Sequence, residues 1–370
     1  MNENQKAFPH WIDTGVWDGG HIQGIAVDPK KEFIYYSYTT VLVKARLDGT
    51  VVGWVGGLLG HLGCIDFNDH NGKVYGSLEY KHDVIGRGIM NHWGVELADE
   101  DAFYVAIFDV DKIDRPYMDA EKDGVMKAVY LPQVVAWYNG VTAEGEATPF
   151  RVTGIDGLGI GPVFGSDKGE ERLMLCSGTY DDPACPEVSD YHVILQFDWR
   201  VLDAIAAPLK QLQPHHVGTE AQCWYFLDVG NTTWGVQNLE YDAYDDSWIV
   251  CVYRGKKEGS PNHPMYVIDG KAAPVTRMGR FGFSHPHLVL KQQGVYHEQT
   301  GIWGIRFSRG QTGVYAFGDG TYYFSHEYNT GDRKNSSLIR LYQRGENPRY
   351  LFEAVGTVRT AKTEAEKHSI

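Results

Sequence analysis

Histidine and other polar side chains recur in this sequence directly before short apolar runs. The stretches that show this are GGHIQGIAVD (19–28), GHLGCIDFND (60–69) and TTWGVQNLEYD (232–242), with weaker versions at 157–167 and 309–320. Each reads as a polar turn, a strand of about five residues and a closing turn rich in Asp and Gly. His21 and His61 stand at the junction of turn and strand in the first two stretches. An imidazole can take up or release a proton near neutral pH, so both are candidates for acid–base chemistry.

A unit that returns along a chain predicts a repeat architecture, and here its topology collects polar residues on one face. In an antiparallel meander, the first strand of a unit begins on the face where the second strand ends. The first-strand starts contribute His21, Gln23, His61, Asn231, Trp234, Gln237, Arg309 and Gln311. The second-strand ends contribute Tyr38, Glu79, Lys81, His82, Tyr180, Asp181, Asp182, Arg254, Lys256, Lys257, His326 and Glu327. We therefore expect these side chains to surround one central pocket.

Several of the collected residues are cations, although the whole protein is acidic. Lys81, Arg254, Lys256 and Lys257 would lie on this face of a chain whose net charge is -14. Local positive charge in a negative protein favours a small anionic ligand, such as a carboxylate. Aromatic side chains at the mouth suit stacking on a sugar ring. These features fit β-elimination on a uronic acid, in which a base removes the proton beside a carboxylate that a cation neutralises.

The sequence therefore predicts a set of site residues with assigned roles. The predicted catalytic residues are His21, His61, Tyr180 and Arg254. The predicted substrate-binding residues are Gln23, Tyr38, Glu79, Lys81, Trp234, Gln237, Lys256, Gln311 and His326. A structural interpretation competes with this one. In it, the two histidines are turn residues that bond a neighbouring carbonyl, the RGKK run at 254–257 is a solvated loop, and the two tyrosines pack within strands.

Three other functions stay open from the residues alone. A glycoside hydrolase needs two carboxylates beside the scissile bond, and the candidates are Glu79, Asp181, Asp182 and Glu327. A non-catalytic domain would bind a partner protein or a glycan. A lactone hydrolase would use a bound divalent metal.

No metal site is predicted from spacing. The pairs considered are His61 with Cys64, His285 with His287, and His215 with His216, and none has the spacing of a zinc site. Asp181 and Asp182 are candidates for Ca²⁺, but no EF-hand-like loop contains them. The cofactor is therefore unknown at this stage, with Ca²⁺ and Zn²⁺ left open.

Short antiparallel strands must position these residues. The four strands expected in the first repeat are QGIAVD, EFIYYSYTT, TVLVKARLDG and TVVGWVGGL, with turns at Asp28-Pro29 and Asp48-Gly49. Four such strands make one blade, and the repeats predict an all-β propeller that forms one domain over 1–370. Five four-stranded blades are favoured, and six or seven blades stay open. Residues 1–18 are expected to close the last blade, and 357–370 to fray. Other expected blade strands are VVAWYN (134–139) and PVTRMG (274–279).

Composition and charge exclude several classes of protein. The net charge of -14 argues against nucleic acid as a partner, and no apolar run is long enough to span a membrane. The five cysteines form no CxxC pair, which indicates free thiols in a reducing compartment. The start of the chain has no apolar signal core, so the expected location is cytoplasmic, or secreted if a signal peptide has been removed. No Walker loop, Rossmann glycine fingerprint, HExxH or GxSxG motif occurs.

The blade openings HIQGIAVD, GHLGCIDF and GVQNLEYD resemble those of carbohydrate-active β-propeller enzymes. The similar families are the propeller polysaccharide lyases and the related lyases that release rhamnose from glucuronate. The resemblance implies a His or Tyr base and an Arg or Lys partner in the propeller mouth, roles that His21, His61, Tyr180 and Arg254 would fill. It also implies a small anionic sugar or oligosaccharide as the substrate.

Overall fold

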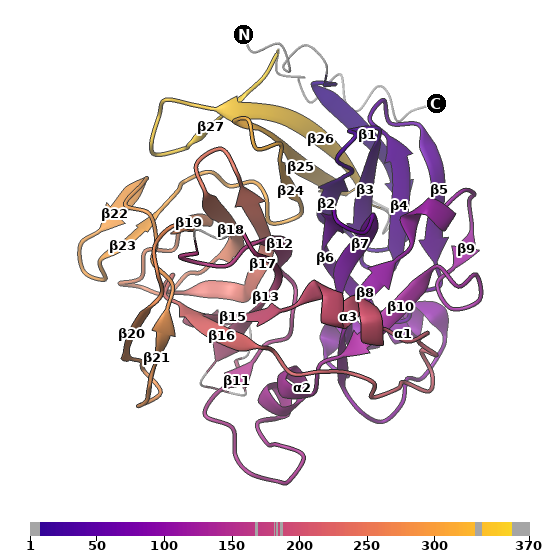
Figure 1. The fold of residues 1–370 in the computed structure, drawn as a ribbon, viewed down its shortest axis with the longest axis horizontal. Helices are drawn as coiled ribbons and strands as arrows, with labels where there is room; N and C mark the ends of the chain where they lie inside the picture. The colour runs from indigo at the N-terminus through magenta and orange to yellow at the C-terminus, as the bar shows by residue number, and fades with distance from the viewer. Residues whose placement is uncertain are drawn as a thin grey trace.

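Antiparallel strands make up most of the regular structure of this chain. The computed structural model describes residues 8–166, 169–180, 182, 184–185, 188–329 and 335–356. Within them, five sheets of four or more strands stand around a common centre (Figure 1), and the predicted all-β propeller is confirmed. The expected frayed tail, 357–370, lies outside the described residues. None of the helices in the described ranges is long and apolar enough to cross a membrane.

Five inner strands form a closed ring at this centre. They are β2 (Ile22–Val27), β6 (His61–Asn68), β12 (Leu158–Pro162), β17 (Thr232–Asp242) and β24 (Val314–Ala316). Each contacts the next in this order, and β24 returns to β2. The strands crowd one another so closely that a Cβ on Gly24 would lie 2.7 Å from the backbone nitrogen of Ile65. This crowding explains why glycine recurs in the stretches that open the repeats.

Each blade continues outward from its inner strand. The first is β2, β3 (Phe33–Tyr38), β4 (Val41–Arg46) and β5 (Val51–Gly56), with β9 (Met118–Asp119) added in parallel. The second is β6, β7 (Lys73–Tyr80), β8 (Ala102–Phe108) and β10 (Met126–Tyr130). The third contains β12, β11 (Arg151–Val152), β13 (Glu171–Tyr180), β15 (Tyr191–Phe197) and β16 (Cys223–Leu227). The fourth contains β14 (Val188–Ser189), β17, β18 (Ser247–Arg254) and β19 (Met265–Asp269).

The fifth blade joins the two ends of the chain. It contains β24, β25 (Thr321–Asn329), β26 (Asn335–Arg344) and β27 (Phe352–Ala354), and β1 (Trp11–Trp17) pairs antiparallel with β26. Figure 1 shows indigo β1 beside yellow β26. This pairing joins the first strand of the chain to the last blade. It also covers the edge of β26 whose backbone groups would otherwise be unpaired.

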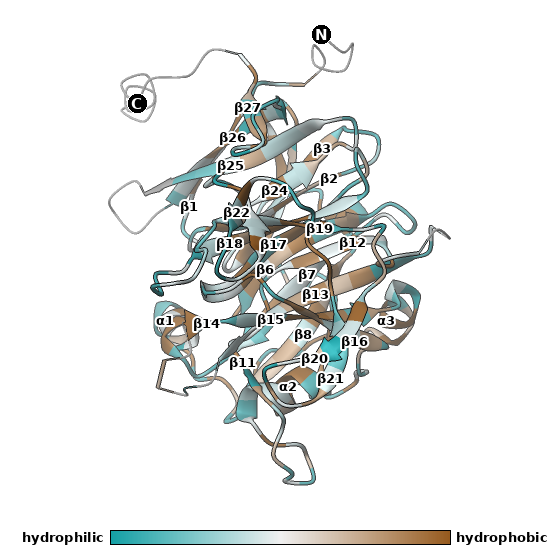
Figure 2. Ribbon diagram, turned by 90° about the vertical axis from the view of Figure 1, so that its left-hand side faces the viewer, coloured by the Kyte–Doolittle hydropathy of each residue, from teal (hydrophilic) through white to brown (hydrophobic). Residues whose placement is uncertain are grey.

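Several shorter elements lie between the blades. The helices are α1 (Val84–Trp93), α2 (Pro132–Asn139) and α3 (Trp199–Ile205), with a 3-10 turn at Val110–Lys112. The remaining strands are β20 (Val275–Met278), β21 (Ser284–His287), β22 (Val295–His297) and β23 (Ile302–Gly304). In Figure 2, α1 and α3 stand at opposite edges of the view.

Two predicted blade strands are wrong. VVAWYN is helical and belongs to α2, because Pro132 occupies the first turn, Gly140 ends the helix in the left-handed conformation, and Val134 and Trp137 are buried on one face. PVTRMG forms β20, which pairs with β21 beside the third blade rather than with β19. All four residues of β20 are exposed, so this strand has no apolar face to bury in a blade.

The core consists of apolar side chains packed between neighbouring blades. Leu42, Leu62 and Leu78 belong to one cluster between the first two blades, and Trp248 packs between the third and fourth. In Figure 2, brown, hydrophobic stretches lie mainly in the strands. None of the five cysteines, all of which lie in the described ranges, forms a disulfide bond. Burial of this kind, at about 25 cal/mol per Å² of apolar surface, is the main term that holds the blades together.

Two carboxyl groups are buried where the inner strands end, and their titration should make stability depend on pH. Burial raises the pKa of Asp66 to about 7, and burial with the neighbouring Asp66 raises the pKa of Glu240 well above its ordinary value. The folded chain therefore holds protons that the unfolded chain releases. The free energy of unfolding should fall as pH rises above about 5, by about 1.4 kcal/mol per pH unit for each such proton.

Glu240→Gln should flatten this fall, most clearly above about pH 7, where Asp66 has already titrated. Glutamine keeps the Oε1 acceptor that binds the backbone N–H of Ala316 but has no proton to lose. Urea unfolding of both proteins at a series of pH values measures the two slopes. Equal slopes would mean that Glu240 is ionised in the folded chain.

Candidate active site

A pocket of about 500 Å³ opens where the inner strands begin, and we call it the axial pocket. This volume lies within the range of small-molecule sites. Its lining residues are His21, Gln23, His61, Glu79, Lys81, Ile85, Thr153, Asp156, Thr233, Trp234, Gln237, Tyr253, Arg254 and Lys256. Most of them lie at the starts of β2, β6 and β17 and at the ends of β7 and β18, as expected for antiparallel connections. The others are Ile85 of α1, and Thr153 and Asp156 between β11 and β12. Nine of the thirteen predicted site residues lie in this lining.

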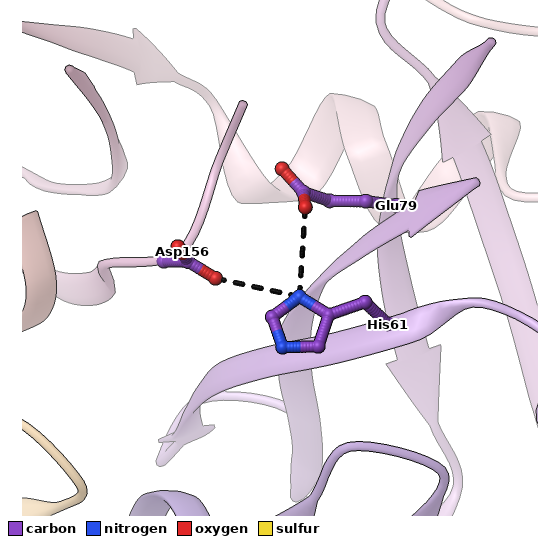
Figure 3. A group of neighbouring side chains, drawn as sticks. All are labelled: His61, Glu79 and Asp156. Carbon is purple, nitrogen blue, oxygen red and sulfur yellow. Dashed lines mark ion pairs between the residues drawn. The ribbon is translucent and has the colours of Figure 1, made fainter. Parts of the chain in front are cut away.

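The floor of the axial pocket is a buried cluster of charged side chains. His61 Nδ1 lies 3.5 Å from Glu79 Oε2 and 3.5 Å from Asp156 Oδ1. Figure 3 shows the two carboxylates approaching the same ring nitrogen from different sides. Lys81 Nζ lies 2.8 Å from Glu79 Oε2 and 3.2 Å from Asp83 Oδ2. The cluster therefore contains three carboxylates, one ammonium and one imidazole.

The pKa values of the cluster move in different directions. Burial raises the pKa of Glu79, but the attraction of Lys81 and the contact with His61 outweigh it, and the pKa ends below its ordinary value. Burial and the negative charge of Glu79 raise the pKa of Asp156. Burial lowers the pKa of His61, but the two carboxylates outweigh it, and the net shift is upward. Two carboxyl groups with opposite shifts are typical of functional sites.

His21 presents an unprotonated nitrogen at the rim of the pocket. Its Nδ1 lies 2.9 Å from the backbone oxygen of Ile22, and a carbonyl oxygen can only accept, so Nδ1 carries the proton. The other nitrogen, Nε2, then accepts a hydrogen bond of 3.2 Å from the side-chain amide of Gln23. The amide of Gln23 is itself held by Thr39 Oγ1 at 3.2 Å. This chain of contacts orients the imidazole beside the cavity, and Nε2 can accept a proton once the Gln23 amide gives up its hydrogen bond.

The lining of the pocket also includes cations and an aromatic ring. Arg254 and Lys256 line the pocket, and neither makes an ion pair with another described residue. Trp234 is partly exposed and has φ 65°, in the left-handed region that costs a side-chain-bearing residue about 1–2 kcal/mol. Backbone strain of this kind is concentrated at functional sites. The rim can therefore bind an anionic group next to a flat ring.

The structure places four of the predicted site residues outside the axial pocket. Tyr38 is buried and its hydroxyl lies 2.7 Å from Thr14 Oγ1, and Tyr180 packs against the Arg151 guanidinium. His326 Nε2 lies 2.8 Å from the Tyr342 hydroxyl, and the backbone oxygen of Gln311 accepts a bond from Asn238. None of these four lines the axial pocket. Their structural partners account for their positions.

The carboxylates proposed for a hydrolase are dispersed. Glu79 is in the pocket, Asp182 is exposed on a loop, and Asp181 lies outside the described residues. Glu327 Oε1 stands 4.0 Å from His21 Nδ1. The pair that does meet, Glu79 and Asp156, was not predicted.

Sequence reasoning missed five residues of the lining. They are Ile85, Thr153, Asp156, Thr233 and Tyr253. A usable signal existed for Asp156, because it precedes β12 as His21 precedes β2. The rule for first-strand starts applies to Asp156 as well, but the weaker repeat stretch at 157–167 begins one residue after it.

The comparisons with known proteins identify no family for this chain. No protein-family model matches it, and no curated protein matches its sequence. In structure it is similar to arabinanase Arb43A of Bacillus subtilis (8% identity, 90% of this chain and 97% of that one, TM-score 0.38). It is also similar to the soluble aldose sugar dehydrogenase of Escherichia coli (10% identity, 89% and 98% coverage, TM-score 0.36). A luciferin-regenerating enzyme aligns at 11% identity over 91% of this chain and 99% of its own, with a TM-score of 0.34.

At these identities and TM-scores, none of the three proteins indicates what this chain binds. The fold assignment rests on the strand pairing of the chain itself, and the function must be inferred from the axial pocket.

The metal pairs considered from spacing are not formed. Cys64 Sγ lies 3.3 Å from Asn238 Oδ1 and 3.2 Å from the Leu158 oxygen, away from the His61 cluster. His285 Nε2 bonds the Trp224 oxygen, and His287 Nδ1 lies 2.9 Å from Asp228. His216 contacts Glu100, whereas the neighbouring His215 contacts the Ala207 oxygen.

A larger cavity, of about 770 Å³, lies beside the hairpins β20–β21 and β22–β23. Its lining includes Asp228, His287 and Arg277, with Tyr296 and Trp303. Asp228 is already paired with both Arg277 and His287. Arg277, the cation in the lining of this larger cavity, is therefore already neutralised by Asp228. The axial pocket is the stronger candidate for an anionic ligand.

Proposed function

We propose that the chain is a carbohydrate-active enzyme that cleaves an acidic sugar polymer or oligosaccharide by β-elimination in the axial pocket. The observation that carries the proposal is a basic His21 Nε2 in the same cavity as Arg254 and Lys256. A cation that neutralises a carboxylate makes the proton on the adjacent carbon more acidic, and a nearby base can then remove it.

Each participant has one role in this reaction. Arg254, with Lys256, binds the carboxylate of the uronate, and Trp234 stacks on a sugar ring. His21 Nε2 takes the proton from the carbon that bears the carboxylate. The electron pair of that C–H bond becomes a new carbon–carbon double bond, and the glycosidic oxygen on the neighbouring carbon leaves with its bonding pair. This oxygen takes a proton from solvent water, and the proton held by His21 returns to solvent. The product has an unsaturated uronate at its end.

A glycoside hydrolase is the second candidate, because the pKa values of Glu79 and Asp156 are pushed apart. Its weakness is the position of Glu79. The Oε1 of Glu79 accepts from the backbone N–H of Ile155, its Oε2 is paired with Lys81, and the residue is only 2% exposed. A carboxylate held on both oxygens is poorly placed to activate water or attack a sugar.

Product analysis on a panel of uronate-containing oligosaccharides, with neutral oligosaccharides as controls, tests the proposal. We expect ultraviolet absorbance from the unsaturated product and new reducing ends to rise together, on acidic substrates only. New reducing ends without that absorbance would replace the lyase by the hydrolase. Turnover of neutral substrates alone, or of none in the panel, would overturn the assignment.

A further inference from the structure

Three buried side-chain atoms on the floor of the axial pocket make no regular hydrogen bond to the described residues. They are His61 Nδ1, Glu79 Oε2 and Asp156 Oδ1, and of the three only Glu79 Oε2 lies within hydrogen-bond distance of a cation, Lys81 Nζ at 2.8 Å. Each pair of these atoms lies within 4.8 Å, so the atoms surround one point (Figure 3). Buried polar atoms are normally satisfied, and leaving one unpaired costs about 1–3 kcal/mol. Three such atoms that face one another indicate a missing ligand.

The remaining oxygens of the two carboxylates are held in place. Glu79 Oε1 accepts from the backbone N–H of Ile155, and Asp156 Oδ2 accepts from Gln237 Nε2 at 3.2 Å. Each carboxylate therefore uses one oxygen for orientation and directs the other at the common point, where Asp156 Oδ1 is free of a cation from the described residues and Glu79 Oε2 is shared with Lys81. Metal ligands in proteins are typically supported in this way by outer hydrogen bonds.

The charge of the cluster indicates the sign of the ligand. Glu79, Asp83 and Asp156 are opposed by the single ammonium of Lys81, so two negative charges are uncompensated when His61 is neutral. Lys81 Nζ is close to Glu79 Oε2 as an ion pair, and a carboxylate oxygen has a second lone pair for another cation. A divalent cation would balance the cluster.

We propose that His61, Glu79 and Asp156 bind one divalent transition-metal ion, Zn²⁺ or Mn²⁺, at the floor of the axial pocket. One imidazole nitrogen with carboxylate oxygens suits these ions, whereas Ca²⁺ takes six to eight oxygen ligands. Two ligand atoms at about 2.1 Å from a tetrahedral metal stand roughly 3.4 Å apart, close to both distances from His61 Nδ1. All three residues line the cavity, so the open coordination positions would face it.

The experiment measures binding of Zn²⁺ and of Mn²⁺ by calorimetry to protein stripped with a chelator. We expect one ion per chain, and a melting temperature that rises with the free ion concentration. Asp156→Asn should weaken binding about 100-fold or more, since it removes a ligand charge. Asp182→Asn is the matched control, because Asp182 is an exposed acid outside the cluster and should bind as the wild type does.

Gln237→Ala guards against a folding defect, because it leaves all three ligands intact and removes only the bond to Asp156 Oδ2. It should weaken binding about 10-fold or more. The proposal is overturned if the wild type binds neither ion, or if Asp156→Asn binds as tightly as the wild type. The proposal does not depend on the acidic-sugar substrate, because binding is measured without substrate, and lyase activity can fail while the ion still binds.

Discussion

Replacing His21 by Ala should lower kcat/KM on an acidic oligosaccharide by about 10²- to 10⁴-fold, the usual contribution of a positioned general base. The imidazole holds its proton on Nδ1 through the Ile22 carbonyl, and the substrate would replace the Gln23 amide at Nε2. Alanine has no group that can accept the proton. The His21 side chain is 38% exposed, so its removal should leave the melting temperature nearly unchanged. Initial rates of product absorbance measure the effect.

Added imidazole should restore part of the activity of His21→Ala, since a free base can enter the space left by the side chain. The matched control is His326→Gln, because His326 bonds Tyr342 and lies outside the pocket. The role of His21 as the base is excluded if its Ala variant keeps full turnover. It is also excluded if imidazole restores nothing while the variant still binds substrate normally.

Replacing Lys81 by Met should lower the free energy of unfolding by about 3–5 kcal/mol, the cost of breaking a buried ion pair from one side. The Lys81 side chain is only 7% exposed and pairs with both Glu79 and Asp83. Methionine fills a similar volume but leaves buried carboxylates without their cation. Urea unfolding in the presence of a chelator measures the change without a contribution from bound metal.

The double variant Glu79→Gln with Lys81→Met should recover part of this loss, because it removes the more deeply buried of the two charges that Lys81 neutralises and leaves only Asp83 without its cation. Glutamine keeps the Oε1 acceptor for the Ile155 N–H. A loss below about 1 kcal/mol in the single variant is what an exposed salt bridge would give, and it would show that water reaches the cluster.

The repeats were sufficient to predict the propeller and most of the pocket. Each repeat has a polar turn, a short apolar strand and a closing turn, and antiparallel connection places the start of one strand beside the end of the next. This rule holds whatever the fine packing is, and for that reason His21, His61, Lys81 and Arg254 meet in one lining.

The direction of individual side chains could not be predicted in the same way. Successive residues of a strand point to opposite faces, so a difference of one position separates a pocket residue from a packing residue. Glu327 lies 4.0 Å from His21, whereas its neighbour His326 turns to Tyr342. The true ends of the short strands decide which residue faces the cavity, and sequence patterns leave those ends uncertain by a residue or two.

The architecture and the kind of residue at the mouth could therefore be predicted from the residues alone, because both follow from local periodicity and connectivity. The contact of Asp156, from the third repeat, with His61 and Glu79 of the second became visible only in the folded chain. That contact depends on how closely two neighbouring blades approach each other, which is set by side-chain packing and by glycines at the axis. Contacts between blades are distant in sequence, and no local pattern records the distance between them.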